Sequence, residues 1–347
     1  MRPWPLRALA LAAASATLLA ACGPSAQPNS TTAPTATLSP GQLVVYSGRA
    51  EDLVGPIIKQ FGELTGIKVQ VRYGDTSALA ATLLEEGQRS PADVFFAQDP
   101  GGLGAIAGML GPLPESILGR ADPRFRSPEG KWVGISGRAR VVVYNTKKLT
   151  ETDLPSSMWD FTDPKWKGRI GWPPTNASFQ AMVTAMRVSW GAEKTRQWLE
   201  GIKANSPKQY PNNTAVVQAV GAGEVDVGFV NHYYLFRFLQ EQGESFPARN
   251  YHPKAGDPGA IILVSGAGIL STARNQAAAQ QFLQFLLSDL GQQYFASKTY
   301  EYPVVKGINT HRVLVPLDKI ESPSIDVTNL ADTKGTLDLL RQTGVVP

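Results

Sequence analysis

Two adjacent tyrosines, Tyr233 and Tyr234, are the residues whose type and spacing most clearly suggest chemistry. They follow an apolar run over 224–230 that reads as a strand, and a helix is expected to follow them. At such a junction, neighbouring side chains no longer have to point to opposite faces, so both hydroxyl groups can reach one point. A phenolate is a hard, anionic oxygen donor, which favours ferric iron. The pair predicts either an Fe(III) site or two half-buried core aromatics at the start of a helix.

Tyr144 is the third candidate phenol. It follows three valines at the end of a predicted strand, near the expected crossing between two lobes. A lone tyrosine in such a place usually packs, with its hydroxyl satisfied locally. Together with the pair, however, it would supply three phenolates, whose charge neutralises Fe(III). The remaining coordination positions could then take a small anion such as carbonate or bicarbonate.

Two arginine-containing stretches could hold that anion. Arg49 lies in a Ser-Gly-Arg turn, and Arg138 and Arg140 lie in the stretch that begins with Ser136 and Gly137. The planar donor fork of arginine matches a planar oxyanion, although most arginines are simply solvated. Glycine turns expose backbone N–H groups beside the guanidinium, which favours Arg49 and Arg138. We therefore predict an anion site of Arg49, Arg138, Ser136 and Gly137.

Other motifs point away from zinc and from catalysis. The three histidines are His232, His252 and His311, and no HExxH or clustered Cys/His spacing is present. His232 adjoins the tyrosine pair, so it could be a ligand or could point away. The sequence contains no GxSxG, SxxK, GxxxxGK[ST] or GxGxxG motif. No catalytic residue is predicted, and the protein is not expected to be an enzyme.

The first residues predict export. Arg2 and Arg7 flank the start of an apolar run, and a Leu-Ala-Ala-Cys tetrapeptide ends at Cys22. We expect a lipoprotein signal peptide over 1–21, lipidation of Cys22, and a flexible linker over 22–40. The alternative is a plain secretory signal with an incidental cysteine. The predicted location is the periplasmic or extracellular face of the envelope, where the lipid anchor is the only contact with the membrane.

Composition narrows the possible partners. The chain has 347 residues, of which 43% are hydrophobic and 18% charged, as in globular proteins. Without Arg2 and Arg7, 31 basic residues stand against 29 acidic ones, which argues against nucleic acid or an anionic membrane surface as partner. Cys22 is the only cysteine, so no disulfide forms within the chain. A monomer is expected.

Hydrophobic periodicity predicts two α/β lobes. Strands and helices alternate from 43 to 96, and a second α/β run follows from 168 to 230. Such alternation indicates mostly parallel sheets flanked by crossover helices, with a ligand in the cleft between the lobes. The predicted boundaries are 41–139 with 264–314 for the first lobe, and 140–263 with 315–347 for the second.

Four stretches resemble the bacterial ferric-iron-binding proteins of ABC importers. They are 45–49, 91–99, 137–145 and 231–234, and the resemblance extends over essentially the whole chain after the linker. It implies a two-lobed periplasmic-binding clamshell of type 2, joined by two hinge strands. It also implies that Tyr233 and Tyr234 bind iron from the second lobe, with Tyr144 as the third phenolate of the tyrosine-rich subgroup.

Two positions depart from that family. Some relatives use a histidine where this chain has Ala50, and some use a glutamate where it has Gln98. The departures favour three tyrosines completed by an anion, and leave open whether Gln98 or His232 contributes. We therefore expect a lipoprotein that captures Fe(III), with carbonate as a synergistic anion, and delivers it to an ABC permease. The same fold binding a small organic anion, a phosphonate or carboxylate, remains the alternative; an exported enzyme of unrecognised mechanism is a third.

Overall fold

The computed structural model describes residues 41–347, except 255, 326–328 and 331. The part of the chain from Pro40 onward forms one compact unit. The predicted signal peptide, the lipidation site Cys22 and the linker lie outside the described residues. Within the described residues, no helix combines the length and apolarity needed to cross a membrane.

The first strands and helices alternate as the sequence predicts. They are β1 (Gln42–Ser47), α1 (Glu51–Thr65), β2 (Lys68–Tyr73), α2 (Thr76–Glu86) and β3 (Val94–Ala97). Strand β1 pairs in parallel with β2 on one side and with β3 on the other. Helix α1 buries Leu53, Ile57 and Phe61, which recur at helical spacing, and it ends at Gly66 in a left-handed conformation.

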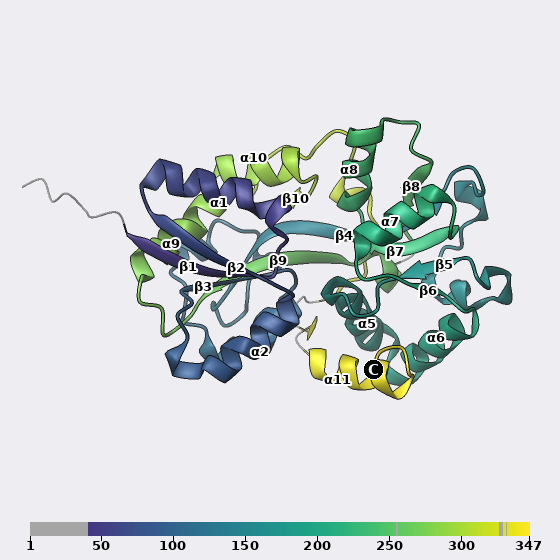
Figure 1. Cartoon of the computed structure of the whole chain (residues 1–347), viewed down its shortest axis with the longest axis horizontal. Coiled ribbons are helices and arrows are strands. Elements are labelled where there is room, and N and C mark those ends of the chain that lie inside the picture. The colour runs from purple at the N-terminus through teal and green to yellow at the C-terminus, as the bar shows by residue number, and fades with distance from the viewer. Residues whose placement is uncertain (1–40, 255, 326–328, 331) are drawn as a thin grey trace, which may run out of the picture. The chain divides into compact units, whose positions relative to one another are not determined.

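The long strand β4 (Val133–Asn145) connects two halves of the sheet. Its first part, up to Ala139, pairs with β9 (Ile262–Ile269) and β10 (Tyr302–Pro303), while Arg140–Asn145 pairs with β7 (Val227–Asn231) and β8 (Ala248–Tyr251). All four of these pairings are antiparallel. The main path of the ten-stranded sheet runs β2-β1-β3-β9-β4-β7-β5-β6. The long ribbons of β4 and β9 lie side by side in the middle of the molecule (Figure 1).

We call β1, β2, β3, β9 and β10 the β1 half of the sheet, and β5–β8 the β7 half. The β7 half contains β5 (Ile170–Trp172), α5 (Ala177–Trp190), α6 (Ala192–Ala204), β6 (Lys208–Gln209), α7 (Asn213–Ala222) and α8 (Tyr233–Gln242). Strands β6 and β7 flank β5 in parallel. The mixed α/β fold, with helices covering the sheet, is confirmed (Figure 1). The residue boundaries of the two lobes stay a prediction.

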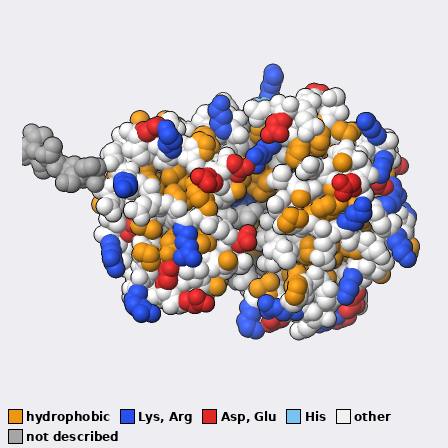
Figure 2. All heavy atoms as spheres, viewed as in Figure 1, with side chains coloured by type: hydrophobic (Ala, Val, Ile, Leu, Met, Phe, Trp, Pro, Cys, Tyr) orange, Lys and Arg blue, Asp and Glu red, His pale blue; other side chains and the backbone are white. Residues whose placement is uncertain are grey.

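Further helices lie along the chain at α3 (Pro100–Ala105), α4 (Glu115–Leu118), α9 (Gln276–Leu286), α10 (Asp289–Lys298) and α11 (Thr333–Gln342). Helix α11 packs beside α5 and α6, so the end of the chain returns to the β7 half. Figure 2 shows Lys and Arg interspersed with Asp and Glu over the face it displays, with no extended patch of one sign.

The packing of α7 on β7 generates a test at Gly228. A Cβ at Gly228 would lie 2.3 Å from Cγ1 of Val216 on α7 and 3.2 Å from Cγ1 of Val143 on β4. We expect Gly228→Ala to lower the free energy of unfolding by about 1–3 kcal/mol, because the added methyl group overpacks the interior. Urea denaturation followed by circular dichroism measures the change.

Gly108→Ala is the matched control, since a Cβ at that position meets nothing within 4 Å. It should change the free energy of unfolding by no more than about 0.5 kcal/mol. Equal stability of the Gly228→Ala protein and the parent would contradict the close packing of α7 on β7.

Candidate functional site

The tyrosine pair lies where β7 passes into α8. Strand β7 ends at Asn231, one residue follows, and the two tyrosines open the helix. Their rings stack at 4.3 Å between centroids and 29° between planes. Tyr233 is fully buried and Tyr234 is 9% exposed. The two phenol rings therefore lie side by side at this junction, directly after the end of the strand at Asn231 and the single residue His232.

Three arginines are buried around the pair. Arg49 is 1% exposed, and Arg138 and Arg140 are fully buried. Arg138 and Arg140 are two residues apart on β4, so they share one face of the strand. The guanidinium carbon of Arg49 lies 5.8 Å from the ring centroid of Tyr233, over its face. The structure thus brings together four of the predicted residues, Tyr233, Tyr234, Arg49 and Arg138, and adds Arg140.

The phenol of Tyr234 is held in the neutral form. Burial raises the pKa of Tyr234 well above its usual value, and the neighbouring Tyr233 raises it further. The charges of Arg49 and Arg138 oppose this rise but do not cancel it. Removal of the phenolic proton therefore requires a strong Lewis acid at the oxygen.

Several buried N–H donors at the site lack an acceptor. Among the described side chains, Nε of all three arginines, one further guanidinium nitrogen each on Arg138 and Arg140, and Nδ2 of Asn231 have no hydrogen-bond partner. The hydroxyl of Tyr233 is likewise without one. A buried guanidinium with unused donors is costly unless an opposite charge compensates it. Donors of this number and kind fit an oxyanion.

Arg140, which was not among the residues predicted for the anion site, is the centre of a polar network. Its NH1 group donates to Oγ of Ser178 (3.3 Å), Oδ1 of Asn213 (3.3 Å) and Oδ1 of Asn231 (3.0 Å). Ser178 and Asn213 lie in the first turns of α5 and α7, whose free N–H groups favour negative charge. Burial lowers the pKa of Arg140 to about 9, against the opposing influence of Tyr234.

Among the described residues, Arg49 is the one of the three arginines that has a direct carboxylate partner. Its NH2 group lies 2.6 Å from Oε2 of Glu301, and both side chains are almost completely buried. Burial acts to lower the pKa of Arg49, but Glu301 and the two tyrosines reverse the effect, so the pKa is raised. Oε1 and Oε2 of Glu301 also accept hydrogen bonds from Ser136 (3.0 Å) and Thr299 (2.9 Å) respectively. Arg49 is thereby fixed over Tyr233.

Ser136 and Gly137 lie in the ladder and not at an exposed turn. The hydroxyl of Ser136 lies 2.6 Å from that of Ser265 and donates to Glu301. Gly137 pairs with Tyr302 of β10 and Val264 of β9, so strands flank it on both sides. The sequence of this stretch suggests a glycine turn, but strand β4 continues through it, with a shift of its register against β9 between Gly134 and Ser136. Ser136 therefore supports Glu301, and the structure places neither residue as a free anion seat.

Tyr144 is not brought to the pair. In the ladder between β4 and β7, Arg140 is opposite Asn231, whereas Tyr144 is opposite Val227 at the far end of β7. At about 3.3 Å per residue, this places Tyr144 roughly 13 Å along the strand from Arg140. Tyr144 packs in a separate apolar cluster with Trp166 and Trp172. Tyr144 does lie near the end of strand β4, as predicted, but at the end of the β4–β7 ladder that is farther from the tyrosine pair. The structure therefore does not bring the three tyrosines together.

The ring of His232 lies edge-on to that of Tyr233, at 5.8 Å between centroids, but both of its nitrogens are engaged elsewhere. Its Nδ1 accepts the backbone N–H of Ala139 at 3.1 Å, and its Nε2 lies 2.7 Å from the carbonyl oxygen of Tyr300. Burial lowers the pKa of His232 to about 3, so the ring is neutral. Both nitrogens are occupied, which removes His232 from the candidate ligands. For Gln98, the structure fixes only the backbone, whose N–H donates to Thr76.

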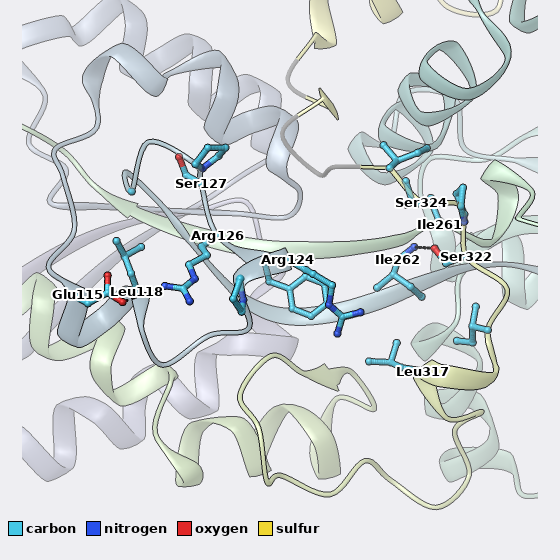
Figure 3. A pocket seen from close by; sticks show the side chains of 17 residues that line it. Glu115, Leu118, Arg124, Arg126, Ser127, Ile261, Ile262, Leu317, Ser322 and Ser324 are labelled. Carbon is cyan, nitrogen blue, oxygen red and sulfur yellow. Dashed lines mark hydrogen bonds and ion pairs between the residues drawn. The ribbon is translucent and has the colours of Figure 1, made fainter.

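A cavity of about 960 Å³ lies elsewhere (Figure 3). Arg124, Arg126 and Ile262 line it, whereas neither the tyrosines nor the three buried arginines do. Its arginines already have carboxylate partners, Asp122 for Arg124 and Glu115 for Arg126. The unpartnered polar groups lie at the tyrosine pair, which is therefore the candidate site in preference to this cavity.

The chain is similar to known proteins over most of its length. The family model described as bacterial extracellular solute-binding protein matches residues 56–317. The "Fe(3+)-binding periplasmic protein" of Serratia marcescens is 36% identical over 88% of this chain and 90% of its own length. The "Major ferric iron-binding protein" of a serogroup A Neisseria meningitidis strain is 35% identical, covering 89% and 95%. The structure of iron-bound HitA from Pseudomonas aeruginosa superposes with a TM-score of 0.85 at 37% identity, covering 88% of this chain and all of the other.

The buried pair of Arg49 and Glu301 gives the prediction for this site. Glu301→Gln removes the negative charge, keeps the shape, and leaves the guanidinium of Arg49 buried without a counter-charge. Breaking a buried ion pair in this way should lower the free energy of unfolding by about 3–5 kcal/mol. Urea denaturation measures the loss.

Glu63→Gln is the control, because Glu63 forms an ion pair with Lys59 at 62% side-chain exposure. That variant should unfold almost as the parent does. A Glu301→Gln protein as stable as the Glu63→Gln protein would show that Arg49 does not depend on the carboxylate.

Proposed function

The chain belongs to the family of bacterial extracellular solute-binding proteins, and we propose that the solute it binds is ferric iron. The observation that carries the proposal is the stacked pair of buried phenols, Tyr233 and Tyr234, beneath three buried guanidinium groups. The names of the relatives from Serratia and Neisseria, which specify ferric iron, support the same choice.

Two phenolates would hold the ion. Fe(III) is a strong Lewis acid that displaces a phenolic proton, and the resulting oxygen donor is hard and anionic. Two phenolates offset two of its three positive charges. A synergistic carbonate or bicarbonate would supply negative charge and oxygen donors for the rest, and its planar shape suits the guanidinium fork.

The seat for that anion is proposed around Arg138, Arg140 and Asn231. These residues carry unused buried donors next to the tyrosines, while Arg49 is already paired with Glu301. Arg49 would then act mainly on the phenolates, since it lies over the ring of Tyr233. Of the predicted anion seat, this assignment keeps Arg138, gives Arg49 a role at the phenolates, and replaces Ser136 and Gly137 with Arg140 and Asn231.

Capture requires opening and closing of the protein. With Tyr233 and all three arginines buried, an ion cannot reach the phenols unless the two halves of the sheet separate. We propose a hinge in β4 near Ala139, where its partner changes from β9 to β7. The closed form would dock on the permease of an ABC importer and release iron there, with Cys22 as the site of a lipid anchor at the envelope.

One observation favours a second candidate. Three buried guanidinium groups and a single paired carboxylate leave the site with an excess of positive charge, which would also suit a phosphonate or a carboxylate ligand. In that case the tyrosines would be walls of the site. The two candidates differ in what the hydroxyl groups do, so removal of these groups separates them.

The double variant Tyr233→Phe/Tyr234→Phe tests the iron site. Titration of the parent with ferric citrate and bicarbonate should produce a visible phenolate-to-iron charge-transfer band, and the double variant should show no band. Folding of the variant is checked by circular dichroism. Absence of the band in folded parent protein would remove iron as the ligand and favour the organic anion, whose binding phenylalanine walls should weaken only slightly.

The pH dependence of iron binding provides a second test. Because the pKa of Tyr234 is raised, its hydroxyl group is protonated before capture, and two phenolates require release of two protons. Each pH unit of acidification should then weaken apparent affinity by about a hundredfold, because protons compete with the metal. The band is followed at pH 7.5 and 6.5 against a fixed excess of citrate. In Tyr234→Phe, with one phenolate left, the dependence should fall to about tenfold; equal affinity of the parent at both pH values would contradict phenolate ligation.

A further inference from the structure

Helices α1 and α8 are joined by an ion pair beside the tyrosine site. NH2 of Arg237 lies 2.5 Å from Oδ2 of Asp52. Asp52 is in the first turn of α1, which packs on β2, whereas Arg237 is on α8, which packs on β8. The ion pair therefore connects the β1 half to the β7 half, and separation of the two helices breaks it.

Each member of the ion pair lies close in sequence to a residue of the tyrosine site. Arg237 is four residues after Tyr233, one turn along the same side of α8. Asp52 is three residues after Arg49, whose guanidinium lies over the ring of Tyr233. The same two segments thus meet twice, through the buried contact of Arg49 with Tyr233 and through the ion pair nearer the surface.

The ion pair is partly open to water. The side chain of Arg237 is 32% exposed and that of Asp52 is 51% exposed, whereas the side chains of Arg49 and Glu301 are almost completely buried. Charges at this exposure attract each other only modestly, and water solvates both once they separate. Such a pair can break and re-form repeatedly, which a fully buried ion pair cannot do without a large desolvation cost.

A second contact between the halves lies at the start of α3. A Cβ at Gly101 would lie 2.5 Å from Cγ2 of Thr333, at the start of α11, and 3.3 Å from the carbonyl oxygen of Leu330. Helix α3 packs on β3 and β9, whereas α11 packs beside α5 and α6. In Figure 1, α11 lies below the central strands and α1 and α8 lie above them. The halves are therefore in contact at two separate places.

We propose that the ion pair of Asp52 and Arg237 is a latch that holds the two halves together over the tyrosine pair, in the metal-free and in the loaded protein. The inference rests on the opening and closing proposed above, and it identifies a residue pair that sets how often the protein opens. Loss of either charge favours the open form but removes no group that would bind iron or the anion. For a partly exposed pair, the open population should rise about two- to fivefold.

Hydrogen–deuterium exchange of the metal-free protein, followed by mass spectrometry, tests the latch without iron. Asp52→Asn is observed in the peptide that contains Tyr233, and Arg237→Gln in the peptide that contains Arg49. Each variant is thus observed in the half that it does not alter, so a purely local loosening goes undetected. Exchange should be about two- to fivefold faster than in the parent. The double variant should be no faster than either single variant, since each change breaks the same contact.

Asp289→Asn is the matched control. Asp289 is also in the first turn of a helix, α10, and it pairs with Arg120 at 3.1 Å. This ion pair connects α10 to the end of α4, and both helices pack against α9 in the β1 half. The control variant should therefore exchange as the parent does in both peptides.

Gly101→Ala is the positive control. Its methyl group should push α3 away from Thr333 and speed exchange in the Tyr233 peptide without altering any charge. In 1 M NaCl the screening length is about 3 Å, so the parent should exchange like Asp52→Asn, whereas the effect of Gly101→Ala should persist.

Iron release provides the functional measurement. Transfer of iron from the loaded protein to excess EDTA, followed by loss of the charge-transfer band, should be about two- to fivefold faster in Asp52→Asn and in Arg237→Gln. Release from Asp289→Asn should match that from the parent. If the parent forms no band, the iron function fails, while the exchange measurement still decides whether the latch exists.

Three results would overturn the latch. The first is exchange in both single variants at the rate of Asp289→Asn. The second is an additive effect in the double variant, because the two charges would then act independently. The third is unchanged exchange in Gly101→Ala, because the halves would then not separate.

Discussion

The buried positive charge around two phenols is the constraint on which the rest of this structure depends. Taking a guanidinium out of water costs several kcal/mol unless opposite charge and hydrogen bonds replace the lost solvent. This protein buries three guanidinium groups within one region, those of Arg49, Arg138 and Arg140. In the part of the chain that the structure describes, only Arg49 has a direct carboxylate partner, Glu301. The unused donors mark the place where we propose that an anion binds.

Strands and helix ends position the polar side chains around these buried guanidinium groups. Alternation along β4 places Arg138 and Arg140 on one face, and the antiparallel pairing with β7 places Asn231 beside Arg140. Helices α5 and α7 begin at the same point and supply Ser178 and Asn213. The tyrosines follow directly because β7 passes into α8 within one residue. Backbone pairing, and not the tyrosine motif alone, therefore assembles the site.

His232 connects the tyrosine pair to the region behind it. Its ring accepts from β4 through Nδ1 and contacts the carbonyl oxygen of Tyr300 through Nε2, which joins the β7 half to the segment that carries Glu301. His232 therefore helps to position the elements around the site, while neither of its ring nitrogens is free to bind a ligand there.

The sequence by itself determined the elements and the chemistry of the key residues. The helical periodicity of apolar residues and the short buried apolar runs predicted the alternating strands and helices over 43–96 and 168–230. These patterns depend only on neighbours along the chain. The Tyr-Tyr pair at a strand-to-helix junction was evident for the same reason. Tertiary structure decided which residues meet. It places Tyr144 opposite Val227, at the end of β7 away from the tyrosine pair, and it pairs Ser136 and Gly137 with neighbouring strands. It also brings Glu301 to Arg49, 252 positions away in the sequence. Strand register and long-range pairing are set by packing between segments distant in the chain, and no local pattern carries that information.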